Sequence, residues 1–276
     1  MGGWSRRRVV SALGVGAAAA ATIGVPSLPT SGGRAGADGR VSSDIRATGR
    51  ARDGARRDDP PTRFDPFVES AFGTSHEGRP IIRWVATPPA PRVSVVVVLG
   101  IHGNERITLP LAASLMNARR PNDVKVTIVP AANPDGWANR TRRNAQGVDL
   151  NRNFPWRWSR STGGPGPGSA PETKAMMRLI EDERPDLCVW VHQPLAYVGP
   201  IGDTPRRYAE RWAETVGDRV RLGIDQHGGG ETWANRVVGS PSLLVEVATW
   251  DTREDRIWAH TQAFSNVLEI VTQRTR

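Results

Sequence analysis

Three side chains in this sequence have the chemical types and the spacing of a metal site: His102, Glu105 and His192. His102 and Glu105 lie three residues apart, directly after an apolar run, and Gly103 lets the backbone turn tightly between them. An imidazole and a carboxylate at this spacing can bind one cation, and zinc favours such donors. A catalytic zinc needs a third protein ligand and an open position, and His192, after another apolar run, is the best candidate.

Each of the five histidines could instead be an ordinary core or surface residue, because a lone His-x-x-Glu matches by chance. His76 lies in a polar turn and His260 in a helical pattern, so neither follows a core strand. His227, beside three glycines, remains a reserve ligand.

The elements that must position these side chains alternate, from Phe64 onward, between short β-branched runs and longer helical patterns. The run from Val93 to Leu99 is almost continuously apolar, as expected for a parallel strand covered on both faces. The pattern predicts an α/β domain with a mostly parallel or mixed twisted sheet and helices on both faces. Strands are expected at 81–86, 93–99, 124–129, 187–191 and 243–247, and helices at 108–118, 171–183, 205–216 and 253–271.

The candidate site residues fall at the ends of predicted strands, where α/β sheets bind their ligands. His102, Asn133 and His192 each follow a strand, and Glu246 lies near the end of the last one. A carboxylate at the position of Glu246 costs free energy to bury unless it has a task or a partner. The alternative is a structural ion pair between Glu246 and an arginine.

Four segments occur in an order that resembles the zinc metallocarboxypeptidases: His102-Gly-Asn-Glu105, Asn133-Pro-Asp-Gly136, Gly147-Val-Asp-Leu-Asn-Arg-Asn-Phe154 and Leu243-Leu-Val-Glu246. Together they resemble the short bacterial branch that includes the murein peptide amidases. Two further segments, 166–173 and 192–195, add to a resemblance that covers residues 64–276. It implies a metallocarboxypeptidase fold, of the phosphorylase/hydrolase-like type.

The resemblance also implies the chemistry of the centre. His102, Glu105 and His192 would bind one Zn²⁺ per chain. Glu246 would be the general base that takes a proton from water and passes it to the leaving amine. Asp149 would orient His102 by fixing its tautomer.

The resemblance further assigns three residues to the substrate. Asn151 and Arg152 match the pair that grips the terminal carboxylate. Arg142 resembles the arginine that stabilises the oxyanion, although Arg140 and Arg143 stand close by in the sequence. The alternative for each arginine is a solvated surface charge.

A glycine-rich run carries the candidate for side-chain specificity. Glu231 stands two residues before Trp233, which resembles the branch of the family that accepts basic side chains. A buried carboxylate there would favour lysine, arginine or the ammonium group of diaminopimelate. An exposed loop glutamate is the alternative. The family's mobile tyrosine, expected near Ile224, is absent.

Composition describes a soluble globular chain, with 38% hydrophobic and 24% charged residues and no long apolar run after the first thirty residues. Of the net charge of +9, residues 1–61 hold +5, from ten arginines and five aspartates. The rest of the chain has no clustered basic stripe, so no nucleic-acid partner is expected. The single cysteine, Cys188, lies in an apolar run and should be a buried thiol.

The N-terminal part should direct the chain out of the cytoplasm. Residues 1–37 combine paired arginines, an apolar stretch and a small-x-small site, which is typical of a twin-arginine signal peptide. A disordered arginine-rich N-terminus is the alternative. Residues 38–63 should form a flexible linker, and 64–276 the catalytic domain. After signal removal no membrane span is expected.

The leading hypothesis is an exported zinc peptidase, extracellular or in the cell envelope, that cleaves an amide bond next to a terminal carboxylate of a peptide or muropeptide. We expect a monomer. One alternative is a non-catalytic relic that binds peptidoglycan peptides. Another is a zinc deacylase of small acylated amino acids, against which the Asn151-Arg152 pair argues.

Overall fold

Four parallel strands form the centre of the sheet: β4 (Val93–Val98), β5 (Val124–Val129), β6 (Leu187–His192) and β9 (Ser242–Glu246). They run side by side in the order β5-β4-β6-β9. Every residue of β6 and β9 is buried, as the apolar sequences of strands covered on both faces require. The predicted positions of these four strands are confirmed to within one residue at each end.

Antiparallel strands flank this centre on both sides. On one side lie β1 (Val9–Val10), β2 (Phe67–Thr74) and β3 (Pro80–Ala86), of which β3 pairs with β5. On the other side β7 (Tyr197–Ile201) pairs antiparallel with β9, and β8 (Arg219–Val220) pairs parallel with β7. The full order is β1-β2-β3-β5-β4-β6-β9-β7-β8. The sheet is therefore mixed, with its parallel part at the centre.

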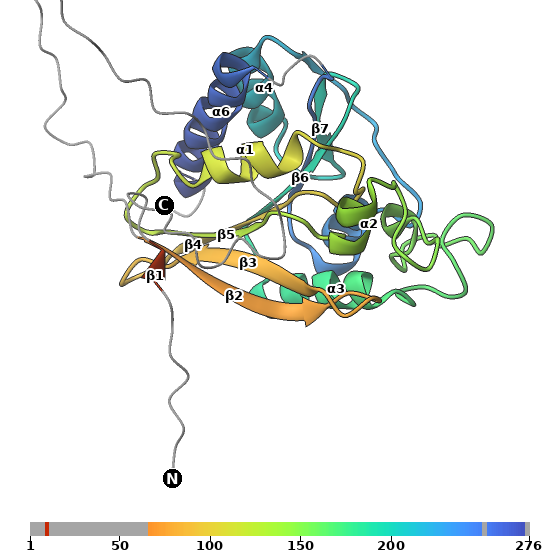
Figure 1. Cartoon of the computed structure of the whole chain (residues 1–276). Coiled ribbons are helices and arrows are strands. Elements are labelled where there is room, and N and C mark those ends of the chain that lie inside the picture. Colours follow the sequence, from red (N-terminus) through yellow and green to blue (C-terminus); the bar gives the residue numbers. More distant parts are fainter. Residues whose placement is uncertain (1–8, 11–65, 250–252, 274–276) are drawn as a thin grey trace, which may run out of the picture. The chain divides into compact units, whose positions relative to one another are not determined.

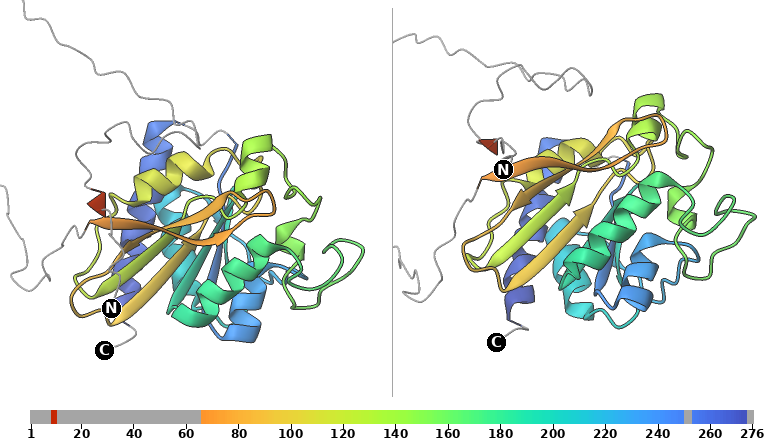
Figure 2. Two further views of the ribbon diagram at one scale, coloured as in Figure 1. Left: turned by 60° about the horizontal axis from the view of Figure 1, so that its bottom comes forward. Right: turned by 90° about the horizontal axis from the view of Figure 1, so that it is seen from below.

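Helices cover both faces of this sheet (Figures 1 and 2). One face carries α1 (Thr108–Leu115), α4 (Arg206–Val216) and α6 (Glu254–Thr272), and the other carries α3 (Pro171–Glu183) and α5 (Gly230–Trp233). Each layer buries its own core. Leu111, Trp212 and Phe264 belong to the first, and Ile180 and Trp190 to the second. The prediction of an α/β fold with helices on both faces is confirmed.

Three short elements complete the fold. Helix α2 (Pro134–Asn139) and the 3₁₀-helix η1 (Leu150–Arg152) lie near the carboxyl ends of the central strands, and the π-helix η2 (Ala234–Val238) leads from α5 toward the start of β9. Cys188 is buried as expected, and burial raises the pKa of its thiol far above the usual value.

The computed structural model describes residues 9–10, 66–249 and 253–273, which all belong to one of the two units into which the chain divides. The predicted signal peptide and linker, 1–37 and 38–63, lie outside these residues except for Val9–Val10. Among the helices of the described part, none has both the length and the apolar character to cross a bilayer.

Candidate metal centre

The loop that follows β4 carries two of the predicted ligands, His102 and Glu105. It leaves the strand at Gly100, whose φ of +62° lies in the left-handed region that favours glycine. At Gly103 the loop touches α2 so closely that a Cβ there would lie 1.8 Å from the carbonyl carbon of Gly136. Only glycine fits, and the contact fixes the loop against α2.

Helix α2 forms because Asn133-Pro-Asp-Gly136 has the composition of a helix start. The side chain of Asn133 accepts a hydrogen bond from the N–H of Gly136 at 2.8 Å, and Pro134 and Asp135 occupy the first turn. The Asn133 amide also donates to the carbonyl of Ile101 at 3.4 Å. One side chain therefore caps α2 and ties it to the loop that carries the ligands.

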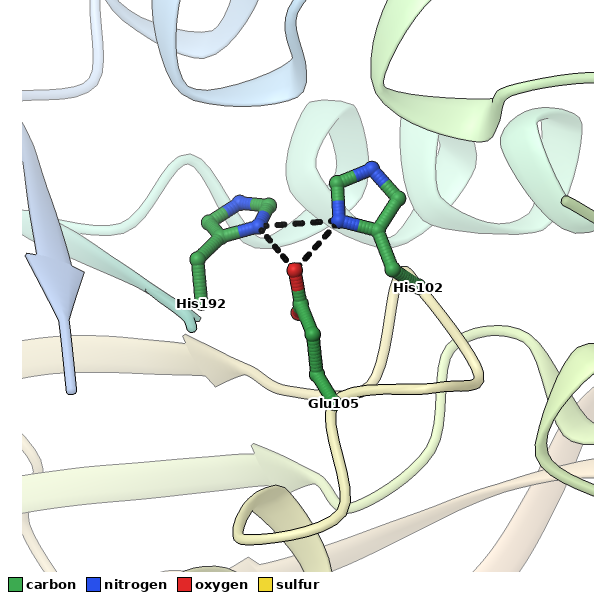
Figure 3. Close-up of side chains that lie close together, drawn as sticks. All are labelled: His102, Glu105 and His192. Carbon is green, nitrogen blue, oxygen red and sulfur yellow. Dashed lines mark hydrogen bonds and ion pairs between the residues drawn. The ribbon is translucent and has the colours of Figure 1, made fainter. Parts of the chain in front are cut away.

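The three predicted ligands converge beyond the carboxyl ends of β4 and β6 (Figure 3). Glu105 Oε1 lies 2.6 Å from His102 Nδ1 and 3.4 Å from His192 Nδ1, and the two Nδ1 atoms are 3.3 Å apart. Donors bound to one tetrahedral zinc at about 2.0–2.1 Å are themselves separated by about 3.3 Å. All three side chains are buried. The geometry is compatible with a single zinc site.

The charges of this cluster fit a cation. Glu105 Oε2 is buried and has no hydrogen-bond partner among the described residues. Burial raises the pKa of Glu105, but the positive fields of His192 and His102 outweigh it and lower the pKa to about 2. Burial lowers the pKa of His192, but the charge of Glu105 outweighs it and raises the pKa to about 9. A divalent ion would supply the positive charge that the buried carboxylate demands.

Asp149 lies behind His102, as the resemblance implies. Its Oδ1 is 3.1 Å from His102 Nε2, and its Oδ2 accepts a hydrogen bond from Arg142 Nε at 3.0 Å. Burial raises the pKa of Asp149, but the hydrogen bond and charge of His102 and the charge of Arg142 hold it well below its usual range. The ionised carboxylate can accept the Nε2–H of His102 and leave Nδ1 for a metal.

The predicted substrate-binding residues reach the site from η1 and from the loop before it. The side chain of Arg142 is 44% exposed, is held by Asp149 through Nε and keeps both Nη groups as donors. Asn151 Nδ2 lies 3.5 Å from His192 Nε2, and its Oδ1 accepts from the N–H of Gly230 at 2.8 Å. Arg152 is half-buried and pairs with no carboxylate in the described part of the chain.

Glu246 ends β9 beside His192, its register partner on β6. It is 8% exposed, and its Oε2 accepts a hydrogen bond from the N–H of Leu195 at 3.3 Å. Within the residues described, no arginine pairs with Glu246, which removes the alternative of a structural ion pair. Burial raises the pKa of Glu246, although the charge of His192 opposes the effect. Such a carboxylate is suited to exchanging protons.

Glu231 is buried rather than exposed. It is 1% exposed in the first turn of α5, and its Oε2 has no hydrogen-bond partner among the described residues. The helix is held in place by Trp233, whose ring centre lies 5.5 Å from that of Phe154. The alternative of a solvated loop glutamate is therefore excluded.

The other histidines lie outside the cluster. His227 is exposed and contacts Arg157, with 3.3 Å between the two nitrogens. His260 is buried in α6 and accepts a hydrogen bond from Trp212 at 3.2 Å. The structure gives no support to His227 as a reserve ligand.

Two residues that fix the ligand loops were missed by sequence analysis. Gln193 Oε1 accepts from the N–H of Ile107 at 3.1 Å and so joins the loop after β6 to the loop after β4. Arg106 directly follows a ligand and packs on Trp137. Their places next to His192 and Glu105 are the only signal that the sequence holds.

Comparison with known proteins agrees with this centre. Residues 65–214, more than half of the chain, match the zinc carboxypeptidase family. Murein peptide amidase A of Escherichia coli K12 is 35% identical over 153 residues, a match that spans 49% of this chain and 62% of that relative.

Two solved structures share the fold. Murein-tripeptide amidase of Escherichia coli O157 matches with a TM-score of 0.59 at 24% identity, over 80% of this chain and 96% of that one. Carboxypeptidase A of Helicoverpa armigera matches with a TM-score of 0.62 at 20% identity, over 76% of this chain and 68% of that one. The family match covers more than half of the chain, and His102, Glu105 and His192 converge in the matching fold. This chain therefore belongs to the zinc carboxypeptidase family.

Proposed function

We propose that this protein is an exported zinc peptidase that hydrolyses an amide bond next to a terminal carboxylate, with murein peptides among its substrates. The observation that carries the proposal is the meeting of His102, Glu105 and His192 beside Glu246, on neighbouring strand ends. Family membership and the murein peptide amidase relatives support the reaction type and the substrate class.

In this proposal Glu246 is the general base. When bound, zinc would acidify water and polarise the scissile carbonyl. The raised pKa of Glu246 suits a carboxylate that accepts a proton from the attacking water and returns it to the leaving amine. The N–H of Leu195 holds one oxygen of Glu246 and so limits its rotation.

Arg152 and Arg142 would bind the two negative charges next to the scissile bond. Arg152, which forms no ion pair with a carboxylate of the described chain, is available for the terminal carboxylate. Asn151 would assist it, although its Oδ1 is occupied by Gly230. Arg142 would donate to the developing oxyanion through the Nη groups that Asp149 leaves free.

Glu231 would select the side chain of the terminal residue. A buried carboxylate oxygen without a partner favours a ligand that brings a positive charge and hydrogen-bond donors. Lysine, arginine and diaminopimelate carry such groups, and diaminopimelate occurs in murein peptides. Export rests on the arginine-rich start of the sequence alone.

The test uses purified protein, the variant Glu246→Gln and defined murein peptides, with products identified by mass spectrometry. Wild type should hold one zinc and release the terminal residue, and Glu246→Gln should keep zinc but lose hydrolysis. Unchanged turnover in that variant would refute the role of Glu246.

Two outcomes would favour the alternatives. Wild type that binds murein peptides without zinc and without cleavage would be a binding relic. Cleavage of acylated amino acids alone would identify a deacylase.

A further inference from the structure

A row of three side chains crosses the sheet next to the metal cluster. Glu246 on β9 is the register partner of His192 on β6 and of Tyr197 on β7. Residues directly opposite each other on paired strands project from the same face of a sheet, and adjacent strands lie about 4.8 Å apart. Tyr197 is thus the next side chain in the row after the metal ligand and Glu246. It is only 4% exposed.

Arg221 lies over this tyrosine. Its guanidinium carbon is 5.1 Å from the ring centre of Tyr197, and its backbone N–H donates to the carbonyl of Val198 at 2.9 Å. The arginine is exposed and, within the described residues, forms no ion pair with a carboxylate. Arg219, the register partner of Tyr197 on β8, adds a second exposed cation to this edge.

The phenol of Tyr197 interacts with both Arg221 and Glu246. Burial and the negative charge of Glu246 raise the pKa of Tyr197, and the charge and hydrogen bond of Arg221 oppose them. The phenol is therefore protonated at neutral pH and can donate a hydrogen bond. A protonated hydroxyl beside a guanidinium that forms no ion pair within the described residues can bind a carboxylate.

The terminal carboxylate already has its own partner in the proposed function, so an anion here must be a different group of the substrate. We propose that Arg221, held over Tyr197, binds a second carboxylate of the peptide substrate. The inference rests on the proposed function. It predicts that a substrate with a further carboxylate has a lower KM than the corresponding amide.

The test compares the tripeptide L-alanyl-γ-D-glutamyl-diaminopimelate with two analogues, one amidated at the glutamyl α-carboxylate and one at the distal carboxylate of diaminopimelate. In wild type, one of the two amidated analogues should have a KM about tenfold higher than the unmodified tripeptide, as expected for the loss of one charge-assisted pair. In Arg221→Gln that difference should disappear through a higher KM for the unmodified tripeptide, with kcat within about twofold of wild type. Tyr197→Phe should reduce the difference in part.

Arg207→Gln is the matched control, because Arg207 is also an exposed arginine over a tyrosine, 5.4 Å from the ring centre of Tyr208 on α4. The Arg207→Gln variant should show the same difference in KM between the tripeptide and its amidated analogues as wild type does. A wild type that treats all three peptides alike, or an Arg221→Gln variant that still discriminates, would overturn the inference. Binding of the same peptides to zinc-loaded Glu246→Gln by calorimetry tests the site even if hydrolysis fails, so the two proposals can fail separately.

Discussion

The guanidinium carbon of Arg106 lies 3.5 Å from the ring centre of Trp137, so the residue after the ligand Glu105 is stacked on helix α2. Its Nη1 also donates to the carbonyl of Trp137 at 2.8 Å and to that of Gly103 at 3.3 Å. These contacts close the loop that carries His102 and Glu105 around the end of α2. The arginine touches no ligand atom, yet it sets the path of the backbone between the two ligands.

The variant Arg106→Met should weaken zinc binding. Methionine keeps apolar contact with Trp137 but removes the hydrogen bond to the Trp137 carbonyl, which is one of the links between the loop and α2, and the hydrogen bond to Gly103 within the loop. We expect the zinc dissociation constant to rise by about tenfold, the scale found when groups that support metal ligands are removed. Competition with a chromophoric chelator measures it. The exposed Arg140 provides the control Arg140→Met, and equal affinities in the two variants would contradict the role given to Arg106.

The variant Gly103→Ala should abolish the metal site. The Cβ of an alanine at this position would lie 1.8 Å from the carbonyl carbon of Gly136 and 2.2 Å from the backbone nitrogen of Trp137, so the loop or α2 must move. Gly166→Ala is the control, because nothing lies within 4 Å of a Cβ at that position. Zinc content after dialysis should fall to well below one per chain in Gly103→Ala alone. Retention of a full zinc would show that loop and helix can separate without harm to the ligands.

The central strands could be predicted from sequence because each is a run of apolar residues buried on both faces. Of the antiparallel flanks only β3 was predicted, at 81–86, whereas β2 and β7 were not. Strand β7 contains Gly199 and Pro200, which weaken a strand pattern, and β2 has an irregular register between Ala71 and Gly73. Helix α2 has six residues, one of them the glycine that touches the metal loop, which is too short for a helical period to show.

The ligands of the site could be predicted because they stand at strand ends, where the rule for α/β sheets places them. Their supports could not, since the partners are far apart in the sequence. Arg106 and Trp137 are separated by 31 residues, and Tyr197 meets Arg221 only because β7 and β8 pair. The burial of Glu231 likewise follows from the packing of Trp233 in α5 against Phe154, which the glycine-rich sequence around Glu231 does not reveal.

Asp135 should make stability depend on pH in the acid range. Its side chain is buried, and it accepts hydrogen bonds from Ser75 Oγ at 2.7 Å, from the N–H of Glu77 at 2.9 Å and from Arg79 at 2.7 Å. Burial raises the pKa of Asp135, but these hydrogen bonds and the charge of Arg79 lower it below the ordinary value.

A depressed pKa in the folded state means that this stabilisation is complete above about pH 4 and is lost as the pH falls through the folded value. Asp135→Asn should lower the free energy of unfolding by about 1–3 kcal/mol at pH 7 and by less at pH 3. Urea unfolding at the two pH values measures both. Asp203→Asn, at a side chain that is 99% exposed, should change neither, and a loss that is equal at both pH values would exclude the ionised form as the cause.

Glu231→Gln should separate stability from substrate selection. The wild-type carboxylate is buried with one oxygen lacking a partner, a state that costs free energy in the absence of a ligand. Removing the charge should therefore leave the melting temperature equal or raise it by a few degrees, on the order of 1 kcal/mol for a domain of this size. The same change should raise KM for peptides that end in lysine or diaminopimelate by about tenfold and leave peptides that end in phenylalanine unaffected. Scanning calorimetry and parallel hydrolysis assays measure the two effects. A fall in melting temperature together with an equal loss for all peptides would mean that Glu231 supports helix α5 and does not contact the substrate.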